Sequence, residues 1–212
     1  LKKYDISILP LHILLGEREF LDGRSITPPE IYLWSDMSGT TPRTSAPSLE
    51  DAIALLEPYV RERREVVCFS ISDEMSASGS VMRLAAGELE AEDLICVVNS
   101  ANLSTGIGLL VVEAAIMAVQ GADAETIVRR MEELKPLVRA SFVVDTLVYL
   151  HRGGRCSGLA ALAGGALKLH PRIMVEDGKM RPGKKYRGNI NKVIMSYVTD
   201  MEEDLKRAKK DR

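Results

Sequence analysis

Apolar and polar positions along the chain predict strands that alternate with helices. Three apolar runs have the length of strands: residues 6–15, 66–71 and 94–98. Apolar residues at helical spacing mark longer segments: residues 28–37, 49–60, 81–89, 106–119 and 124–134. Because strands linked through helices run parallel, this order predicts an α/β fold in which helices flank a parallel sheet.

The pattern changes after Pro136, which breaks the last of these helices. A new strand is expected from Ser141, a glycine loop at residues 152–155, and a β-hairpin around Asp177-Gly178. A final helical pattern covers residues 189–210. We therefore predict two α/β domains, a larger one over residues 1–138 and a smaller one over residues 139–212.

A further helix is predicted over residues 158–167, where small or apolar side chains cover nearly the whole circumference. Such a helix must be buried. Its small side chains either let another helix approach closely or leave a narrow channel for a long apolar ligand. The sequence is compatible with both arrangements.

Hydroxyl-rich segments precede three of the predicted helices, at residues 40–48, 72–80 and 99–105. In parallel sheets, ligands bind beyond the carboxyl ends of the strands. Helix N-termini at that edge supply free backbone N–H groups and a partial positive charge, so we expect the ligand to carry an anionic group. Plain turn and helix-capping chemistry is the competing explanation for any single segment.

Composition and motifs argue against several other functions. The net charge of -2 offers no field for nucleic acid, and three widely separated cysteines are typical of a reducing cytoplasm. No run is apolar and long enough to span a bilayer. His12, His151 and His170 are isolated, and GxSxG, SxxK and GxxxxGK motifs are absent. We expect a cytoplasmic protein with no cofactor, no metal site and no nucleic-acid partner.

Three motifs resemble those of the DegV family, and the resemblance extends over essentially the whole chain. The family's TSxPS loop is matched by TSAPS at residues 44–48, and its SxxxSG(T/S) loop is matched loosely by residues 72–78. The long DTLxYLxxGGR block is matched by residues 145–155. Ala77 and Ser78 stand where the family has glycine and threonine, so we expect altered backbone freedom in that loop.

The resemblance implies a two-domain carrier that encloses one long-chain fatty acid in an apolar tunnel. In such proteins hydroxyls hold the carboxylate, which maps onto Thr44 and Ser76, with Arg187 as a cationic helper. The implied ligand-binding set is Thr44, Ser45, Ser76, Ala77, Ser78 and Arg187. The family's opening strand and its C-terminal segment have no counterpart here, so we expect a fragment with an incomplete site.

Family members of known role present the bound acid to a separate fatty acid kinase, which phosphorylates the carboxylate. The resemblance therefore implies a binding protein rather than an enzyme, with a fatty acid kinase subunit as its partner. The alternative is an enzyme acting on a small phosphorylated or carboxylated metabolite, with the hydroxyl segments as an anion cradle. A regulatory protein whose ligand controls a partner is a third alternative.

Overall fold

The computed structural model describes residues 2–156 and 169–210 and divides into two compact units. The first unit comprises Leu1–Val138 and the second comprises Arg139–Arg212. The small-residue helix predicted at residues 158–167 lies outside the described residues. Among the helices that the structure describes, none has the length and apolar character needed to cross a membrane.

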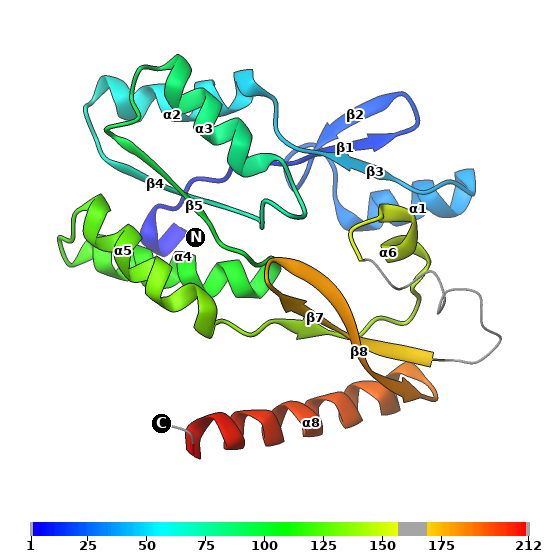
Figure 1. The fold of residues 1–212 in the computed structure, drawn as a ribbon. Helices are drawn as coiled ribbons and strands as arrows, with labels where there is room; N and C mark the ends of the chain where they lie inside the picture. Colours follow the sequence, from blue (N-terminus) through cyan, green and yellow to red (C-terminus); the bar gives the residue numbers. More distant parts are fainter. Residues whose placement is uncertain (1, 157–168, 211–212) are drawn as a thin grey trace. The chain divides into compact units, whose positions relative to one another are not determined.

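The first unit contains a parallel strand pair between two layers of helices (Figure 1). Strands β4 (Val66–Ser70) and β5 (Ile95–Asn99) run parallel. One face is covered by α2 (Leu49–Arg61) and α3 (Ser78–Glu88), and the other by α4 (Ser104–Val119) and α5 (Ala124–Leu134). This arrangement confirms the predicted α/β fold with helices on both faces of a parallel sheet.

Each face of this strand pair has its own apolar core. Under α2 and α3 the buried residues are mostly small: Ala52, Leu56, Ala85, Ala86, Ala91 and Ile95. Under α4 and α5 they are larger: Val98, Leu110, Ala114, Ile127 and Met131. Burying a valine, leucine, isoleucine or methionine side chain contributes about 1.5–3 kcal/mol, so both cores fix the helix N-termini relative to the strand ends.

A separate antiparallel sheet in the first unit has the strand order β2-β1-β3. It comprises β1 (His12–Leu15), β2 (Arg18–Leu21) and β3 (Arg43–Ser45), and α1 (Pro28–Ser38) follows β2 along the chain. The predicted strand over residues 6–15 therefore begins only at His12. Pro10 has no N–H to donate to a strand ladder, which explains the late start.

The first hydroxyl-rich segment was predicted to be a loop over residues 40–47, which is wrong at Arg43, Thr44 and Ser45. Thr44 lies opposite Ile13 and Ser45 lies opposite His12, so both belong to β3. Strand β2 pairs with only one edge of β1. Strand β3 pairs with the other edge and so supplies its hydrogen-bond partners. The first hydroxyl segment thus belongs to the antiparallel sheet and not to the parallel pair.

Capping boxes formed by side chains mark the starts of α1 and α2. The Thr27 N–H donates to the Glu30 carboxylate at 2.8 Å before α1, and Ser48 Oγ accepts from the Asp51 N–H at 3.1 Å in α2. Helices α3 and α4 start earlier than predicted, at Ser78 and Ser104. Apolar spacing detects only the buried face of a helix, so it misses polar first turns.

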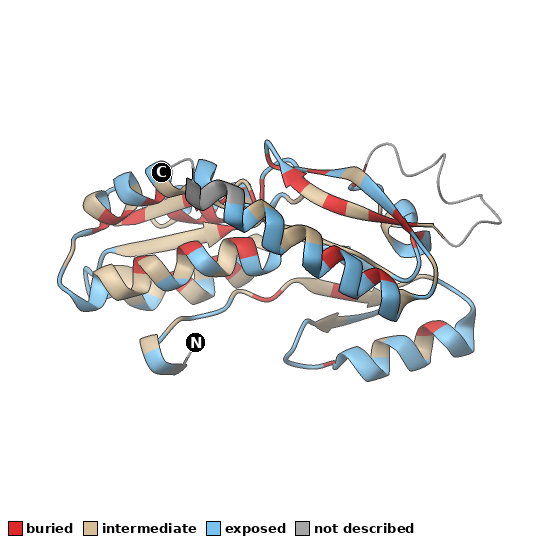
Figure 2. Ribbon diagram, turned by 90° about the horizontal axis from the view of Figure 1, so that it is seen from below, coloured by how far each residue is buried: buried red, intermediate tan, exposed pale blue. Residues whose placement is uncertain are grey.

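The second unit is built on an antiparallel sheet with the strand order β6-β7-β8. These strands are β6 (Ser141–Phe142), β7 (Leu169–Glu176) and β8 (Lys179–Arg187). Asp177 and Gly178 both have positive φ, as the predicted tight turn between β7 and β8 requires. Buried positions alternate with more exposed ones along much of β7, the pattern of a sheet with one covered face (Figure 2).

Helix α8 (Ile190–Lys210) packs on this sheet through Val193 and Tyr197. The Tyr197 ring meets Tyr186 edge-on, with centroids 6.4 Å apart. The predicted glycine loop at residues 152–155 is partly helical, because α6 (Val148–Gly153) ends at Gly154 in the left-handed conformation that favours glycine. The second unit confirms the smaller α/β domain.

Candidate functional site

Polar side chains gather at the carboxyl ends of β4 and β5. We call this group the serine cluster: Ser70, Ser72, Ser76, Ser78, Ser100 and Asn102. Ser100 Oγ donates to the Ser70 carbonyl at 2.7 Å, and the Ser72 N–H donates to the Asn102 carbonyl at 2.9 Å. These bonds join the two loops, so the second and third hydroxyl segments lie side by side.

The predicted residues Ser76, Ala77 and Ser78 lie at the start of α3, where Ser78 is the first helical residue and the other two precede it. The hydroxyl oxygens of Ser76 and Ser78 lie 2.7 Å apart, and Ser76 Oγ also accepts from the Ser78 N–H at 3.2 Å. Ser78 is 7% exposed and Ser76 is half-buried. Ala77 precedes the helix and supplies no side-chain cap. The start of α3 therefore combines two hydroxyls with a helix N-terminus whose N-cap residue supplies no side-chain hydrogen bond.

Ala77 takes the place of the family's glycine without backbone strain. Its φ of -79° and ψ of 3° lie in a region that any L-residue adopts. The expected change in backbone freedom therefore has no conformational penalty at this residue. The glycine that this turn requires is Gly79, because a Cβ there would lie 2.4 Å from Asp73 Oδ1 and 2.8 Å from Ser70 Oγ.

Ser70 lies beneath this turn and is a residue that sequence reasoning missed. It is 2% exposed, and its Oγ has no hydrogen-bond partner among the described residues. A buried hydroxyl without a partner is uncommon because its desolvation is not compensated. The available signal was a serine at the end of an otherwise apolar strand.

A cavity of about 580 Å³ runs along β4 and reaches the serine cluster. At the carboxyl end of β4 its wall includes Ser70, Ser78 and Ser104. Elsewhere apolar side chains line it, including Leu9, Leu55, Val111 and Ala114. The cavity thus has a hydroxyl-rich part close to the helix N-termini.

The apolar part of this cavity follows the outer edge of β4. In the part of the chain that the structure describes, β5 is the only strand that pairs with β4. The Val66 N–H donates to the Leu94 carbonyl, so the backbone groups of the alternate residues Val67 and Phe69 point to the outer edge. Since an alkyl chain cannot hydrogen-bond with these groups, we include only the hydroxyl-rich part in the candidate site.

The other predicted ligand residues lie elsewhere. Thr44 and Ser45 are exposed in β3, and neither side chain bonds with a described residue of the serine cluster. Arg187 is exposed at the end of β8 in the second unit. The structure therefore brings Ser76, Ala77 and Ser78 together in one turn, while the roles of Thr44, Ser45 and Arg187 stay predictions.

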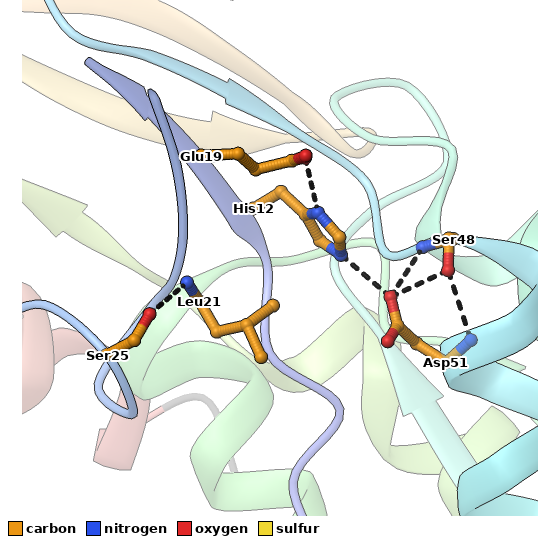
Figure 3. A network of polar contacts seen from close by, with 6 residues as sticks. All are labelled: His12, Glu19, Leu21, Ser25, Ser48 and Asp51. Carbon is orange, nitrogen blue, oxygen red and sulfur yellow. Dashed lines mark hydrogen bonds and ion pairs between the residues drawn. The ribbon is translucent and has the colours of Figure 1, made fainter. Parts of the chain in front are cut away.

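His12 is not isolated, contrary to the sequence analysis, because it lies between two carboxylates (Figure 3). Its Nδ1 lies 2.6 Å from Glu19 Oε1, and its Nε2 lies 2.7 Å from Asp51 Oδ2. The hydrogen bonds with Glu19 and Asp51 raise the pKa of His12. The pKa of Asp51 is lowered by its hydrogen bond with the Ser48 side chain and, to a smaller extent, by its hydrogen bond with His12. The network joins the β1-β2 hairpin to the start of α2.

Metal-ligating side chains and thiols are the other groups in the described residues that could carry chemistry. The described part contains no group of three or more histidine, cysteine, aspartate or glutamate side chains suited to a metal ion. Burial raises the pKa of the Cys68 thiol to about 12, and burial also raises the pKa values of Cys96 and Cys156. These thiols therefore stay protonated near neutral pH.

Relatives of this chain are named for a common family. The family model described as uncharacterised protein, DegV family, matches residues 1–212. A DegV domain-containing protein of Caldanaerobacter subterraneus subsp. tengcongensis is 31% identical, over 93% of this chain and 71% of its own length. A Thermotoga maritima protein named fatty acid-binding protein is 30% identical, over 96% of this chain and 72% of its own length.

Solved structures give the same result. A stearic acid-binding protein of Eubacterium ventriosum matches with a TM-score of 0.88 at 29% identity, over 99% of this chain and 73% of its own. DegV of Bacillus subtilis, described as a fatty acid binding protein, matches with a TM-score of 0.82 at 26% identity, over 97% and 73%. The whole-length family match and the relatives at 30% and 31% identity show that this chain belongs to the DegV family.

Proposed function

We propose that this protein binds one long-chain fatty acid and holds its carboxylate at the serine cluster. The observation that carries the proposal is that the Ser76 and Ser78 hydroxyls lie together at the N-terminus of α3, where the N-cap residue Ala77 supplies no side-chain hydrogen bond. Relatives named for fatty-acid binding support the choice of ligand. The serine cluster thus supplies the head-group end of the site.

Neutral donors at a helix N-terminus suit a carboxylate that leaves water. An ionised carboxylate loses its hydration on burial, and this loss must be offset by hydrogen bonds. Hydroxyls and backbone N–H groups donate such bonds, and the partial positive charge of the helix end adds electrostatic stabilisation. These groups stabilise an acid more than the matching neutral alcohol.

The fatty acid tail requires apolar walls of its own. Each buried methylene contributes roughly 0.8 kcal/mol, so a long tail supplies most of the affinity without polar contacts. We propose that the tail lies in an apolar tunnel. Thr44 and Arg187 remain the proposed additional contacts of the carboxylate.

We further propose that the protein presents the bound acid to a separate fatty acid kinase. A carboxylate held by hydroxyl donors keeps an oxygen lone pair available for reaction. That oxygen attacks the γ-phosphorus of ATP on the kinase, the bond to the β-phosphate oxygen breaks, and acyl phosphate and ADP result. In this scheme our chain supplies position and solvation, while the kinase supplies the nucleotide.

Titration of delipidated protein with palmitate and with hexadecanol tests the binding proposal. The protein is produced from its complete gene, and calorimetry measures both affinities. We expect palmitate to bind more tightly, since only palmitate carries the charge that the donors stabilise. Equal affinities would contradict a head-group site for an anion, and absence of palmitate binding would contradict the function. ATP-dependent acyl phosphate formation with an added fatty acid kinase tests the presentation step.

A further inference from the structure

We propose that Ser70 is an additional head-group ligand, whose hydroxyl donates to the carboxylate from the floor of the serine cluster. This inference rests on the proposed function and deepens it. Ser70 differs from the predicted ligand residues because it belongs to strand β4 and not to a hydroxyl loop. The ligand class is an anionic oxygen at the head of an acyl chain.

The Ser70 hydroxyl is buried and has no partner among the described residues. Ser70 is 2% exposed, and its Oγ is the one buried side-chain oxygen or nitrogen without a hydrogen bond in the described part of the chain. Its neighbours Ser72 and Ser100 are equally buried, but their hydroxyl oxygens do form hydrogen bonds. A polar atom kept at such a position indicates a partner that binds from outside the fold.

Ser70 also lies in the cavity wall at the start of α3. Ser70 lines the cavity together with Ser78, the buried serine of the first turn of α3. Its Oγ lies 2.8 Å from the position that a Cβ would take on Gly79. Only a glycine leaves room above the hydroxyl at this turn, so Gly79 keeps the Ser70 hydroxyl next to the helix N-terminus.

The groups around Ser70 share the chemistry of hydrogen-bond donors. Ser70 and Ser78 each carry an O–H donor, and the first turn of α3 adds backbone N–H groups and a partial positive charge. Asp73 is the nearby carboxylate, and it forms an ion pair with Arg83 at 2.9 Å. The negative charge of Asp73 is therefore compensated, and the donors favour an acid over its neutral ester.

Ser70→Ala tests this inference, and Ser80→Ala, which changes an exposed serine of the same helix, is the matched control. The protein comes from its complete gene and is delipidated before titration with palmitate and methyl palmitate. We expect Ser70→Ala to weaken palmitate binding roughly tenfold, as for one lost hydrogen bond to a charged group. Methyl palmitate binding should change little, and Ser80→Ala should leave both affinities unchanged.

Urea denaturation of the ligand-free proteins shows whether the effect is local. Removal of an unpaired hydroxyl should leave the stability of Ser70→Ala equal to or above that of the wild type. If the wild type binds palmitate and Ser70→Ala binds it equally well, the inference is wrong while the proposed function stands. If the wild type binds no palmitate, both are wrong. A large loss of stability in Ser70→Ala would show an internal role for the hydroxyl and also overturn the inference.

Discussion

The hydroxyl oxygens of Ser76 and Ser78 lie 2.7 Å apart at the start of α3. One hydroxyl donates to the other, so the pair retains one O–H that is free for a ligand. Ser76 Oγ also accepts the Ser78 N–H, which fixes the orientation of its lone pairs. The pair is therefore oriented before any ligand binds.

Alanine substitutions of Ser76 and Thr44, made singly and together, test whether both hydroxyls hold one carboxylate. A lost hydrogen bond to a charged group costs about 1 to 3 kcal/mol. We therefore expect each single variant to weaken palmitate binding roughly 5- to 150-fold in a calorimetric titration. Because neighbouring ligands of one group couple, the double variant should deviate from the sum of the single losses. Full affinity in Thr44→Ala would remove Thr44 from the site.

Gly79→Ala should destabilise the first unit, although alanine is a better helix former than glycine. The new Cβ would lie 2.8 Å from Ser70 Oγ, which is buried and cannot move far. Overpacking of this kind costs about 1 to 3 kcal/mol, against a gain of roughly 1 kcal/mol in helix propensity. Urea denaturation should show a lower unfolding free energy.

In Gly87→Ala of the same helix, the new Cβ makes only an ordinary contact, so stability should rise. Equal gains in both variants would show that the turn at Gly79 relaxes freely.

The contribution of His12 to stability should depend on pH. Its folded pKa is raised, so its contribution is complete below the ordinary histidine value of 6.5 and is lost as pH rises through the folded value. Asp51 has a lowered pKa, so its contribution is present above 3.8 and is lost as pH falls through the folded value. The difference in unfolding free energy between wild type and His12→Gln should therefore be largest between these two values.

Chemical denaturation at about pH 5 and about pH 9 measures this difference. His151→Gln, which replaces an exposed histidine of the second unit, serves as the control. A difference for His12→Gln that stays constant over this range would show that the two carboxylates do not stabilise the protonated ring.

Tyr197→Phe should weaken the attachment of α8 to its sheet. The Tyr197 O–H donates to the Ser141 carbonyl at 2.6 Å, and the ring stays in contact with Tyr186 in the variant. Loss of the hydroxyl leaves this carbonyl without that donor, which costs about 1 to 2 kcal/mol. Circular dichroism during urea denaturation should report the lower free energy of unfolding.

The control is Ser196→Ala, which changes the neighbouring exposed residue. Its free energy of unfolding should stay within about 0.5 kcal/mol of the wild type. Equal stability of the two variants would contradict an anchoring role for Tyr197.

Local signals in the sequence predicted those parts of the fold that depend on neighbouring residues. Ser48 and Asp51 mark the start of α2 because the cap is a side chain three residues from its partner. The turn at Asp177-Gly178 was predictable because an Asp-Gly pair favours the positive φ that a tight hairpin turn requires, and both residues have positive φ. The start of α3 was less visible, because its N-cap is Ala77 and its first turn is polar.

Contacts between distant residues could not be predicted in the same way. His12 is 7 residues from Glu19 and 39 residues from Asp51, and no local pattern indicates that they meet. Thr44 is part of β3 because this segment pairs with the free edge of β1. That edge exists only in the assembled sheet. Ser70 resembled an ordinary strand residue until its position under Gly79 was known.

Mass spectrometry of an organic extract shows whether this protein carries a fatty acid, as we propose. Protein produced from the complete gene is purified without added lipid, and the extract is compared with one from a mock purification. We expect one saturated or unsaturated acyl chain per protein molecule, bound as the free acid. Folded protein that repeatedly yields no acyl chain, and takes up none when palmitate is added, would contradict it.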